Sequence, residues 1–273
     1  MSKLYFLFAL VLLCCACKRE SDLPPLSPDE FTAEQRELLG SRLAEAIQAY
    51  PDLFPIKRRQ SESDQALYQY LQWLYEQASH FYHFDQQDAP KDIWDSNRLW
   101  ELHIIESSSV NAFALPGGDF YITAGMLLSL QGVDQLFALL ALELTRMQDR
   151  FLFYKYIEQF GTLSMLDYIE RGDIGQADPL DFLNILSQAS YDKEVVQMID
   201  QRSLDHICQS SIFDPEALKD LELHFLQTQS DWIARKSYPG RAQQLLNILE
   251  ASSADCGQRG DEGDYQRFVL DHL

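Results

Sequence analysis

The sequence has little positive charge, and this limits what the protein can bind. Lysine and arginine together number 22, against 42 aspartates and glutamates, so the formal net charge is −20 at pH 7. So acidic a chain is repelled by the phosphates of nucleic acids and by anionic lipid headgroups. We therefore expect no nucleic acid partner, and we attribute the acidic surface to solubility.

Cysteine is also scarce, with five residues in 273. Cys14 and Cys15 lie at the end of the first apolar stretch, and only Cys208 and Cys256 occur beyond residue 17. In an oxidising compartment two such cysteines can form one disulfide, so Cys208 and Cys256 are a candidate pair. Two unrelated thiols are the alternative.

Long apolar runs are confined to the N-terminus. Leu4–Leu13 follows Lys3, and it is short for a membrane span but typical of the apolar part of a targeting signal. Ala16 precedes Cys17, an arrangement that resembles a bacterial lipoprotein signal and implies cleavage after Ala16 and lipid on Cys17. By the same resemblance, Lys18 favours anchoring at the periplasmic face of the outer membrane. An ordinary cleaved signal and an uncleaved anchor are the alternatives.

Beyond the signal, the composition is that of a globular chain, with 46% hydrophobic residues. We expect residues 27–250 to form one domain. The expected segments are a signal peptide (1–16), a tether (17–26), N-terminal helices (27–95), a core (96–250) and a polar tail with a short terminal helix (251–273).

The N-terminal region reads as helices. Ser27 begins a capping-box pattern, with Pro28 at the first helical position. The helices are expected to continue to about Tyr50, with an interruption at Gly40. A further helix is expected from Asp64 to Phe84, because its apolar residues share one face.

Three short segments predict a small sheet. Trp100–Glu106 alternates apolar and polar residues, and both Val110–Leu115 and Phe120–Thr123 have the composition of strands. Pro116-Gly117-Gly118 between the last two is typical of a turn. A helix is expected to open near Ala124.

The sequence is organised around a helix expected at Asp134–Phe151, DQLFALLALELTRMQDRF. Its apolar residues cover most of the circumference, so the helix should lie in a core. Glu143 stands in this apolar setting, where a carboxylate is costly to bury without a partner. The surroundings of Glu143 therefore decide what this segment does.

From Trp100 to Met147 the chain resembles a family of enzymes. The motif NAFALPGG, starting at Asn111, is followed by an apolar strand, then by T-x-G, and then by a leucine-rich helix with a glutamate. These features are similar to zinc peptidases of the CAAX-prenyl-protease and heat-shock-protease X type, peptidase family M-48. The resemblance implies an α+β, mainly helical, zincin-like metallopeptidase fold, with a small sheet beside a central, normally zinc-binding helix.

The resemblance fails at the zinc site. The family needs two histidines one helical turn apart, and Leu142 and Arg146 occupy these positions. Leu142 has no lone pair to donate, and Arg146 places a permanent cation where zinc would bind. Glu143 keeps the position of the general base that would act on a zinc-bound water. We therefore expect the zinc to be lost, with no other cofactor in its place.

The later motifs of the family are also altered. The third zinc ligand is a glutamate, which falls at Glu194 in one alignment. If Asp200 is instead taken as the aspartate of the same motif, the ligand position is Val196. In the segment that resembles the family's T-H-P-x-x-x-x-R, Tyr238 replaces the histidine and Gln244 replaces the arginine.

The buried charge of Glu143 then needs another partner. We expect Arg146, three residues along the same helix, to supply the charge that the metal supplies in the family. Arg146 would pair with Glu143 or with Glu194, since contacts between arginine and a carboxylate are strong. The alternative is that both side chains reach solvent in an open cleft.

One sheet edge of the family receives substrate as an added strand, which pairs through backbone hydrogen bonds. Asn111, Ala112 and Phe113 match this edge. A polypeptide or an envelope protein is therefore the expected partner, bound without regard to much of its sequence. The alternative is that these residues only shape the turn and the packing.

Three functions remain open from the sequence. The first is a peptidase-like envelope lipoprotein that is not an enzyme and binds polypeptide or partner proteins in the periplasm, in envelope assembly or quality control. The second is an active metalloendopeptidase with atypical ligands drawn from His103, His206 or His224. The third is a structural envelope lipoprotein. The first agrees best with the loss of both motif histidines.

Overall fold

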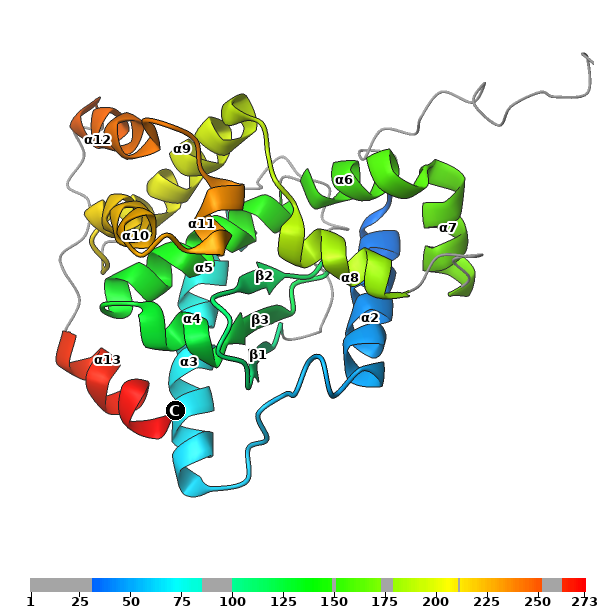
Figure 1. Ribbon diagram of the computed structural model, residues 1–273, viewed down its shortest axis with the longest axis horizontal. Helices are drawn as coiled ribbons and strands as arrows, with labels where there is room; N and C mark the ends of the chain where they lie inside the picture. The colour runs from blue at the N-terminus through cyan, green and yellow to red at the C-terminus, as the bar shows by residue number, and fades with distance from the viewer. Residues whose placement is uncertain (1–30, 85–99, 149–150, 173–178, 211, 252–261) are drawn as a thin grey trace, which may run out of the picture.

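The computed structural model describes residues 31–84, 100–148, 151–172, 179–210, 212–251 and 262–273. Helices dominate, and three short strands form one small sheet among them (Figure 1). This confirms the predicted class, α+β and mainly helical. The elements are α2 (Ala33–Ala49), α3 (Glu62–Phe84), β1 (Leu102–Ile105), β2 (Ala112–Ala114), β3 (Phe120–Thr123), α4 (Ala124–Ser129), α5 (Val133–Gln148), α6 (Phe151–Phe160), α7 (Thr162–Arg171), α8 (Pro179–Gln188), α9 (Lys193–Ser210), α10 (Glu216–Gln227), α11 (Asp231–Lys236), α12 (Arg241–Ala251), α13 (Glu262–Phe268) and the 3-10 helix η4 (Leu270–His272).

The sheet has the strand order β1-β3-β2, so β3 is central. β1 runs parallel to β3, and β2 runs antiparallel to it, with Phe113 opposite Tyr121. The Pro116-Gly117-Gly118 turn connects β2 to β3, and both glycines have positive φ, 91° and 102°. A side chain on Gly118 would also collide with the indole of Trp100, 2.1 Å from the position of its Cβ. The turn therefore requires glycine, as the sequence indicated.

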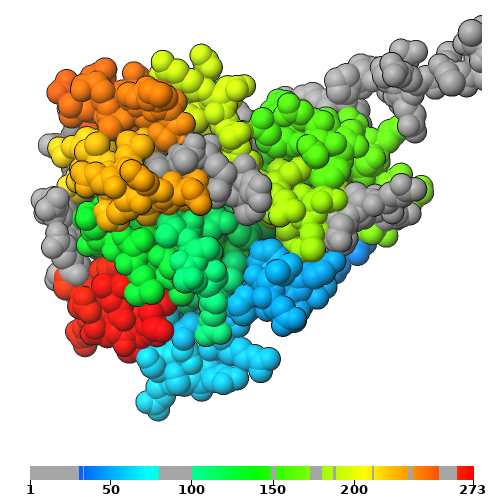
Figure 2. Space-filling model, in the orientation of Figure 1, coloured from blue at the N-terminus to red at the C-terminus, as the bar shows by residue number. Residues whose placement is uncertain are grey.

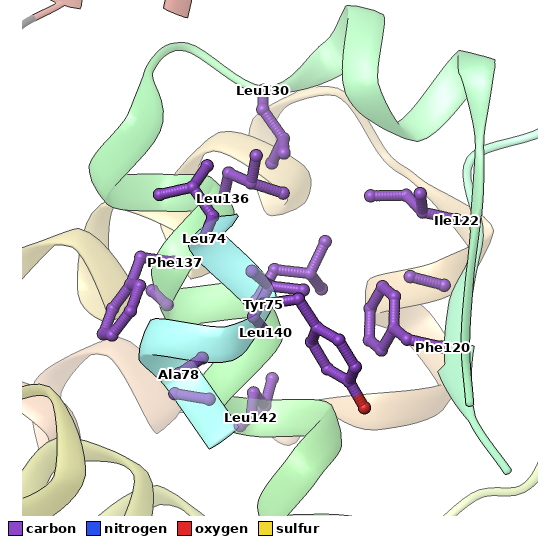
Figure 3. Packing of buried hydrophobic residues seen from close by; sticks show 14 of the residues in the cluster. Leu74, Tyr75, Ala78, Phe120, Ile122, Leu130, Leu136, Phe137, Leu140 and Leu142 are labelled. Atoms are coloured by element: carbon purple, nitrogen blue, oxygen red, sulfur yellow. The ribbon is translucent and has the colours of Figure 1, made fainter. Parts of the chain in front are cut away.

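The main hydrophobic core lies between the sheet, α3 and α5 (Figure 3). Apolar side chains repeat around nearly all of α5, which explains why every residue from Gln135 to Arg146 is buried. The helix predicted from residue 134 to 151 is observed as α5 to Gln148, followed by α6 from Phe151. The residues that meet in this core include Leu74, Tyr75, Phe120, Ile122, Leu136, Phe137, Leu140 and Leu142.

The expected interruption at Gly40 is wrong. α2 runs without a break from Ala33 to Ala49, and its N-cap is Thr32, whose hydroxyl accepts a hydrogen bond from the Gln35 amide. Gly40 instead marks a close approach, because a Cβ there would lie 1.6 Å from the carbonyl oxygen of Pro116. The missing side chain lets α2 lie directly against the Pro-Gly-Gly turn. The segment beginning at Ser27, where the sequence suggested a cap, lies outside the described residues.

Two groups of helices flank the sheet (Figure 1). On one side α9 and α10 pack on α5, and α12 packs on α9 and α10; on the other side α2, α6, α7 and α8 enclose a second hydrophobic core. α13 (red in Figure 2) covers α3 and α5, with Tyr265 buried and Phe268 stacked on Tyr70 at 4.9 Å. The terminal helix expected in the polar tail is therefore part of the packed fold. Over the described residues, no helix has both the length and the hydropathy needed to cross a bilayer.

Candidate functional site

Glu143 lies on α5 and is almost completely buried, with 4% of its side chain exposed. Its neighbour Leu142 points into the main core, fully buried. On the next turn, the Thr145 hydroxyl donates to the Ala141 carbonyl at 2.8 Å and accepts a hydrogen bond from Ser203 of α9 at 3.0 Å. α5 therefore presents the carboxylate of Glu143 to the protein interior.

Two cations hold this carboxylate. Arg146, one turn along α5 and 3% exposed, donates from Nη1 to Oε1 of Glu143. Lys236, at the end of α11 and 2% exposed, donates from Nζ to the same oxygen at 2.8 Å. The expected pairing of Arg146 with Glu143 is confirmed, and the alternative of an open, solvated cleft is wrong. The second cation was not foreseen.

Aromatic rings enclose the two cations. The guanidinium of Arg146 lies 5.7 Å from the ring centroid of Trp232 and 5.9 Å from that of Tyr191. The ammonium of Lys236 is 5.1 Å from the Trp232 ring. Burial raises the pKa of the Tyr191 phenol, and the field of Arg146 only partly opposes this. Because such rings attract cations when water is excluded, they help to keep both charges in the interior.

This arrangement does not fit a zinc ion. A zinc site needs lone pairs from histidine, cysteine or carboxylate side chains. Here the two helical positions hold a leucine and an arginine, and the one carboxylate is already neutralised by two cations. A divalent cation beside Glu143 would therefore meet two positive charges and find one ligand.

A second buried ion cluster lies next to the first. Arg241 of α12 donates from Nε and Nη2 to the two carboxylate oxygens of Asp200 at 3.0 and 2.6 Å, and from Nη1 to Glu222 at 2.6 Å. Nη1 is also 3.4 Å from the carbonyl oxygen of Lys236. Burial alone would lower the pKa of Arg241, but Asp200 and Glu222 together raise it. This cluster joins α9, α10 and α12 and fixes the end of α11, which carries Lys236.

Sequence reasoning missed both Lys236 and Arg241. The resemblance placed the arginine of the T-H-P-x-x-x-x-R motif at Gln244, three residues after the arginine that is buried. A signal was nevertheless present, because Asp200 and Glu222 are carboxylates that share helix faces with apolar residues such as Ile199 and Leu221. Two such carboxylates require a buried cation.

The other positions proposed from the family motifs are dispersed. Glu194 is exposed at the start of α9, and Val196, the alternative ligand position, is buried. Tyr238 is partly buried, and the ammonium of Lys193 lies 5.3 Å from its ring centroid. Neither Glu194 nor Tyr238 is among the residues that line the cavity at Glu143.

The predicted peptide-binding residues lie on an edge strand of the sheet, since β2 pairs with β3 on one side only, but β2 is buried and α5 and α8 pack against it. The Asn111 side chain accepts a hydrogen bond from the Ala112 amide at 3.0 Å, and the Ala112 carbonyl lies 3.4 Å from Nζ of Lys236. Phe113 stacks on Tyr121 with ring centroids 5.4 Å apart. These contacts place Lys236 between the strand edge and Glu143.

The three histidines of the alternative metal site lie on separate elements. His103 in β1 stacks on Tyr121 at 4.7 Å, His206 is buried in α9, and His224 on α10 lies beside Phe225. Within the described part of the chain, no three histidine, cysteine, aspartate or glutamate residues are grouped so that they could hold a metal ion.

The cysteines are only partly placed. Cys208, in α9, is disulfide-bonded. Cys256, its predicted partner, lies outside the described residues, as does Cys17, the predicted lipidation site. The pairing of Cys208 with Cys256 and the lipid on Cys17 therefore stay predictions.

Comparison with known proteins gives a limited result. No family model matches the chain. A segment of 48 residues is 46% identical to the mitochondrial metalloendopeptidase OMA1 of Schizosaccharomyces pombe, and it covers 18% of this chain and 14% of the yeast protein. The matched segment is thus about a seventh of that protein's length. The similarity supports a metallopeptidase-like relationship, limited to this short segment.

Proposed function

We propose that this chain is a peptidase-like envelope lipoprotein that binds polypeptide and does not cleave it. The observation that carries the proposal is the position of Glu143, whose carboxylate is bonded by both Arg146 and Lys236. A general base must reach the proton of a water molecule. Here Oε1 of Glu143 already accepts hydrogen bonds from two cations. Leu142 and Arg146 stand at the positions of the two histidines that would hold the zinc ion.

The sheet edge supports the binding part of the proposal. The Asn111 carbonyl and the Leu115 amide bond to β3, at 3.0 and 2.7 Å. Because the direction of backbone groups alternates along a strand, the amide and carbonyl of Ala112 and Ala114 face away from β3. Those of Ala112 are bonded to the side chains of Asn111 and Lys236, so strand addition would use the backbone of Ala114. Ala114 also lines the cavity at Glu143. An extended polypeptide added at this edge would therefore lie beside the ion pair.

Hydrolysis is tested first. The purified protein should contain no stoichiometric transition metal by mass spectrometry, and it should not cleave casein with or without added zinc. Cleavage that is lost in Glu143→Gln but kept in Glu158→Gln, which changes an exposed glutamate, would overturn the proposal. It would favour the alternative of an active endopeptidase.

Binding is tested with fluorescently labelled, unfolded casein and fluorescence anisotropy. Ala114→Pro removes an outward-facing amide and should weaken binding, whereas Ala114→Gly keeps the amide and should not. The melting temperatures of both variants are measured, so that unfolding is not mistaken for lost affinity. If the wild type does not bind, or if Ala114→Pro binds as tightly as the wild type, strand addition at β2 is wrong and a structural role is favoured.

The envelope location rests on the N-terminal sequence alone. Cells that express the full chain should incorporate labelled palmitate into the protein and retain it in the outer-membrane fraction. Cys17→Ser should abolish both. Palmitate incorporation that persists in Cys17→Ser would contradict the lipoprotein assignment.

A further inference from the structure

Two side chains bond to the backbone of β2 on the side that faces away from β3. Oδ1 of Asn111 accepts a hydrogen bond from the Ala112 amide at 3.0 Å, and Nζ of Lys236 lies 3.4 Å from the Ala112 carbonyl oxygen. A strand added at this edge would bond to the same two backbone groups. Asn111 and Lys236 therefore occupy the hydrogen-bonding positions that an added strand would take at Ala112.

The other end of the edge is closed by a proline and a helix. Pro116, two residues after Ala114, has no amide hydrogen. Its carbonyl oxygen lies against α2, since a Cβ on Gly40 would be only 1.6 Å from it. Between residues 112 and 116, the edge therefore offers an added polypeptide the amide and carbonyl of Ala114 alone.

Lys236 is held firmly in this position. Its side chain is 2% exposed, and Nζ also donates to Oε1 of Glu143 at 2.8 Å. Its backbone carbonyl lies 3.4 Å from Nη1 of Arg241, so both buried ion clusters fix the end of α11. Lysine is one of the residues with which proteins block the pairing of an edge strand with another chain. A lysine anchored at both its backbone and its ammonium suits this role.

We propose that Asn111 and Lys236 are specificity-determining residues of the β2 edge, which restrict an added polypeptide to the backbone of Ala114. The inference rests on the proposed binding of polypeptide at this edge. With Ala112 closed, a polypeptide bonds to β2 through one of its own residues, so a short extended segment suffices. Removing either side chain frees one backbone group of Ala112, which is buried. Because a buried polar group without a partner favours an added one, loss of either side chain should strengthen binding.

The first test changes Asn111 and measures the Kd for labelled, unfolded casein by fluorescence anisotropy. Asn111→Ala frees the Ala112 amide and should lower the Kd about 2- to 10-fold, the value of one hydrogen bond. Asn111→Asp keeps an oxygen that accepts from this amide, so its Kd should stay closer to that of the wild type. Asn247→Ala is the control, because Asn247 is exposed and accepts from Gln243 at 3.0 Å. An Asn111→Ala protein that binds no more tightly than the wild type, or an equal gain in Asn111→Asp, would overturn the proposal.

The second test changes Lys236. Lys236→Met frees the Ala112 carbonyl and should also lower the Kd about 2- to 10-fold. Lys219→Met removes the same charge from a lysine that pairs with Glu216 at 3.0 Å, and it should leave the Kd unchanged. Melting temperatures are measured for all variants, because Lys236 also belongs to a buried ion cluster. If Lys236→Met does not fold, the Asn111 variants decide; if it folds and its Kd is unchanged, the role of Lys236 is wrong.

The same measurements separate this inference from the proposed function. If neither the wild type nor any variant binds casein, polypeptide binding at β2 is wrong, and the restriction to Ala114 is wrong with it. If the wild type binds and Ala114→Pro weakens binding, while the Asn111 and Lys236 variants bind as the wild type does, strand addition stands and only the restriction is wrong.

Discussion

Glu143→Gln is the substitution that best tests whether Glu143 acts in stability or in catalysis. Glutamine matches glutamate in size and shape, so the change removes a charge without opening a cavity. In a zinc peptidase the equivalent change acts on catalysis. Here it should act on stability, because Glu143 is the only carboxylate bonded to Arg146 and Lys236 among the described residues.

The magnitude follows from burial. All three side chains are at most 4% exposed, so solvent cannot screen the charges that remain. Removing one partner of a buried ion pair costs about 3–5 kcal/mol, because it leaves an uncompensated charge in the interior. For a chain of this size, that loss corresponds to a fall in melting temperature of about 6–20 °C. The upper part of the range is expected, since two cations lose their counter-ion.

Thermal unfolding followed by circular dichroism measures the effect, and Glu158→Gln is the matched control. Glu158 is also paired to a cation three residues away, Lys155 at 3.2 Å, but its side chain is 72% exposed. The control should change stability by less than about 1 kcal/mol. A Glu143→Gln protein that melts within 2 °C of the wild type, a margin of about 1 kcal/mol or less, would refute the electrostatic reasoning.

Further predictions concern the neighbouring features. Arg146→Met should cost about 1.5–3 kcal/mol, less than Glu143→Gln, because Lys236 still neutralises the carboxylate; a larger loss in chemical denaturation would contradict this. Arg241→Met should cost about 3–5 kcal/mol by the same assay, because its carboxylate partners stay buried, and a neutral effect would contradict the bonded geometry. Gly40→Ala should cost about 1–3 kcal/mol or more through overpacking, and an unchanged melting temperature would show that α2 lies farther from the turn. The pKa of Asp64 is lowered from its ordinary value of 3.8, first by a hydrogen bond from the Ser61 amide. A lowered pKa gives stability that is present above pH 4 and lost as pH falls below it. The melting temperature of Asp64→Asn should therefore depend less on pH than that of the wild type between about pH 4 and 2. An equal dependence on pH in the two proteins would contradict the lowered pKa.

The local elements could be predicted from the sequence because neighbouring residues specify them. The glycines at 117 and 118 adopt the positive φ that the turn requires, which places one strand on each side of them. The apolar periodicity of residues 134–148 specifies a helix with no solvent-facing side. The role of Gly40 was predicted wrongly, because it is set by a contact with a distant segment and not by neighbouring residues. Its role depends on the turn at Pro116, which is 76 residues away along the chain and in contact with it in space.

The sequence by itself determined that Leu142 and Arg146 offer no lone pairs to a metal ion, whatever the fold. Only the tertiary structure decided which charged groups surround Glu143. Lys236 lies 93 residues from Glu143 in the chain and reaches it because α11 packs on α10 and ends beside β2 and α5, where Nζ of Lys236 bonds to Ala112 and Glu143. Arg241 and Asp200 are likewise 41 residues apart. A buried charge needs a partner, but the sequence cannot name it, because the partner is chosen by which helices meet in space.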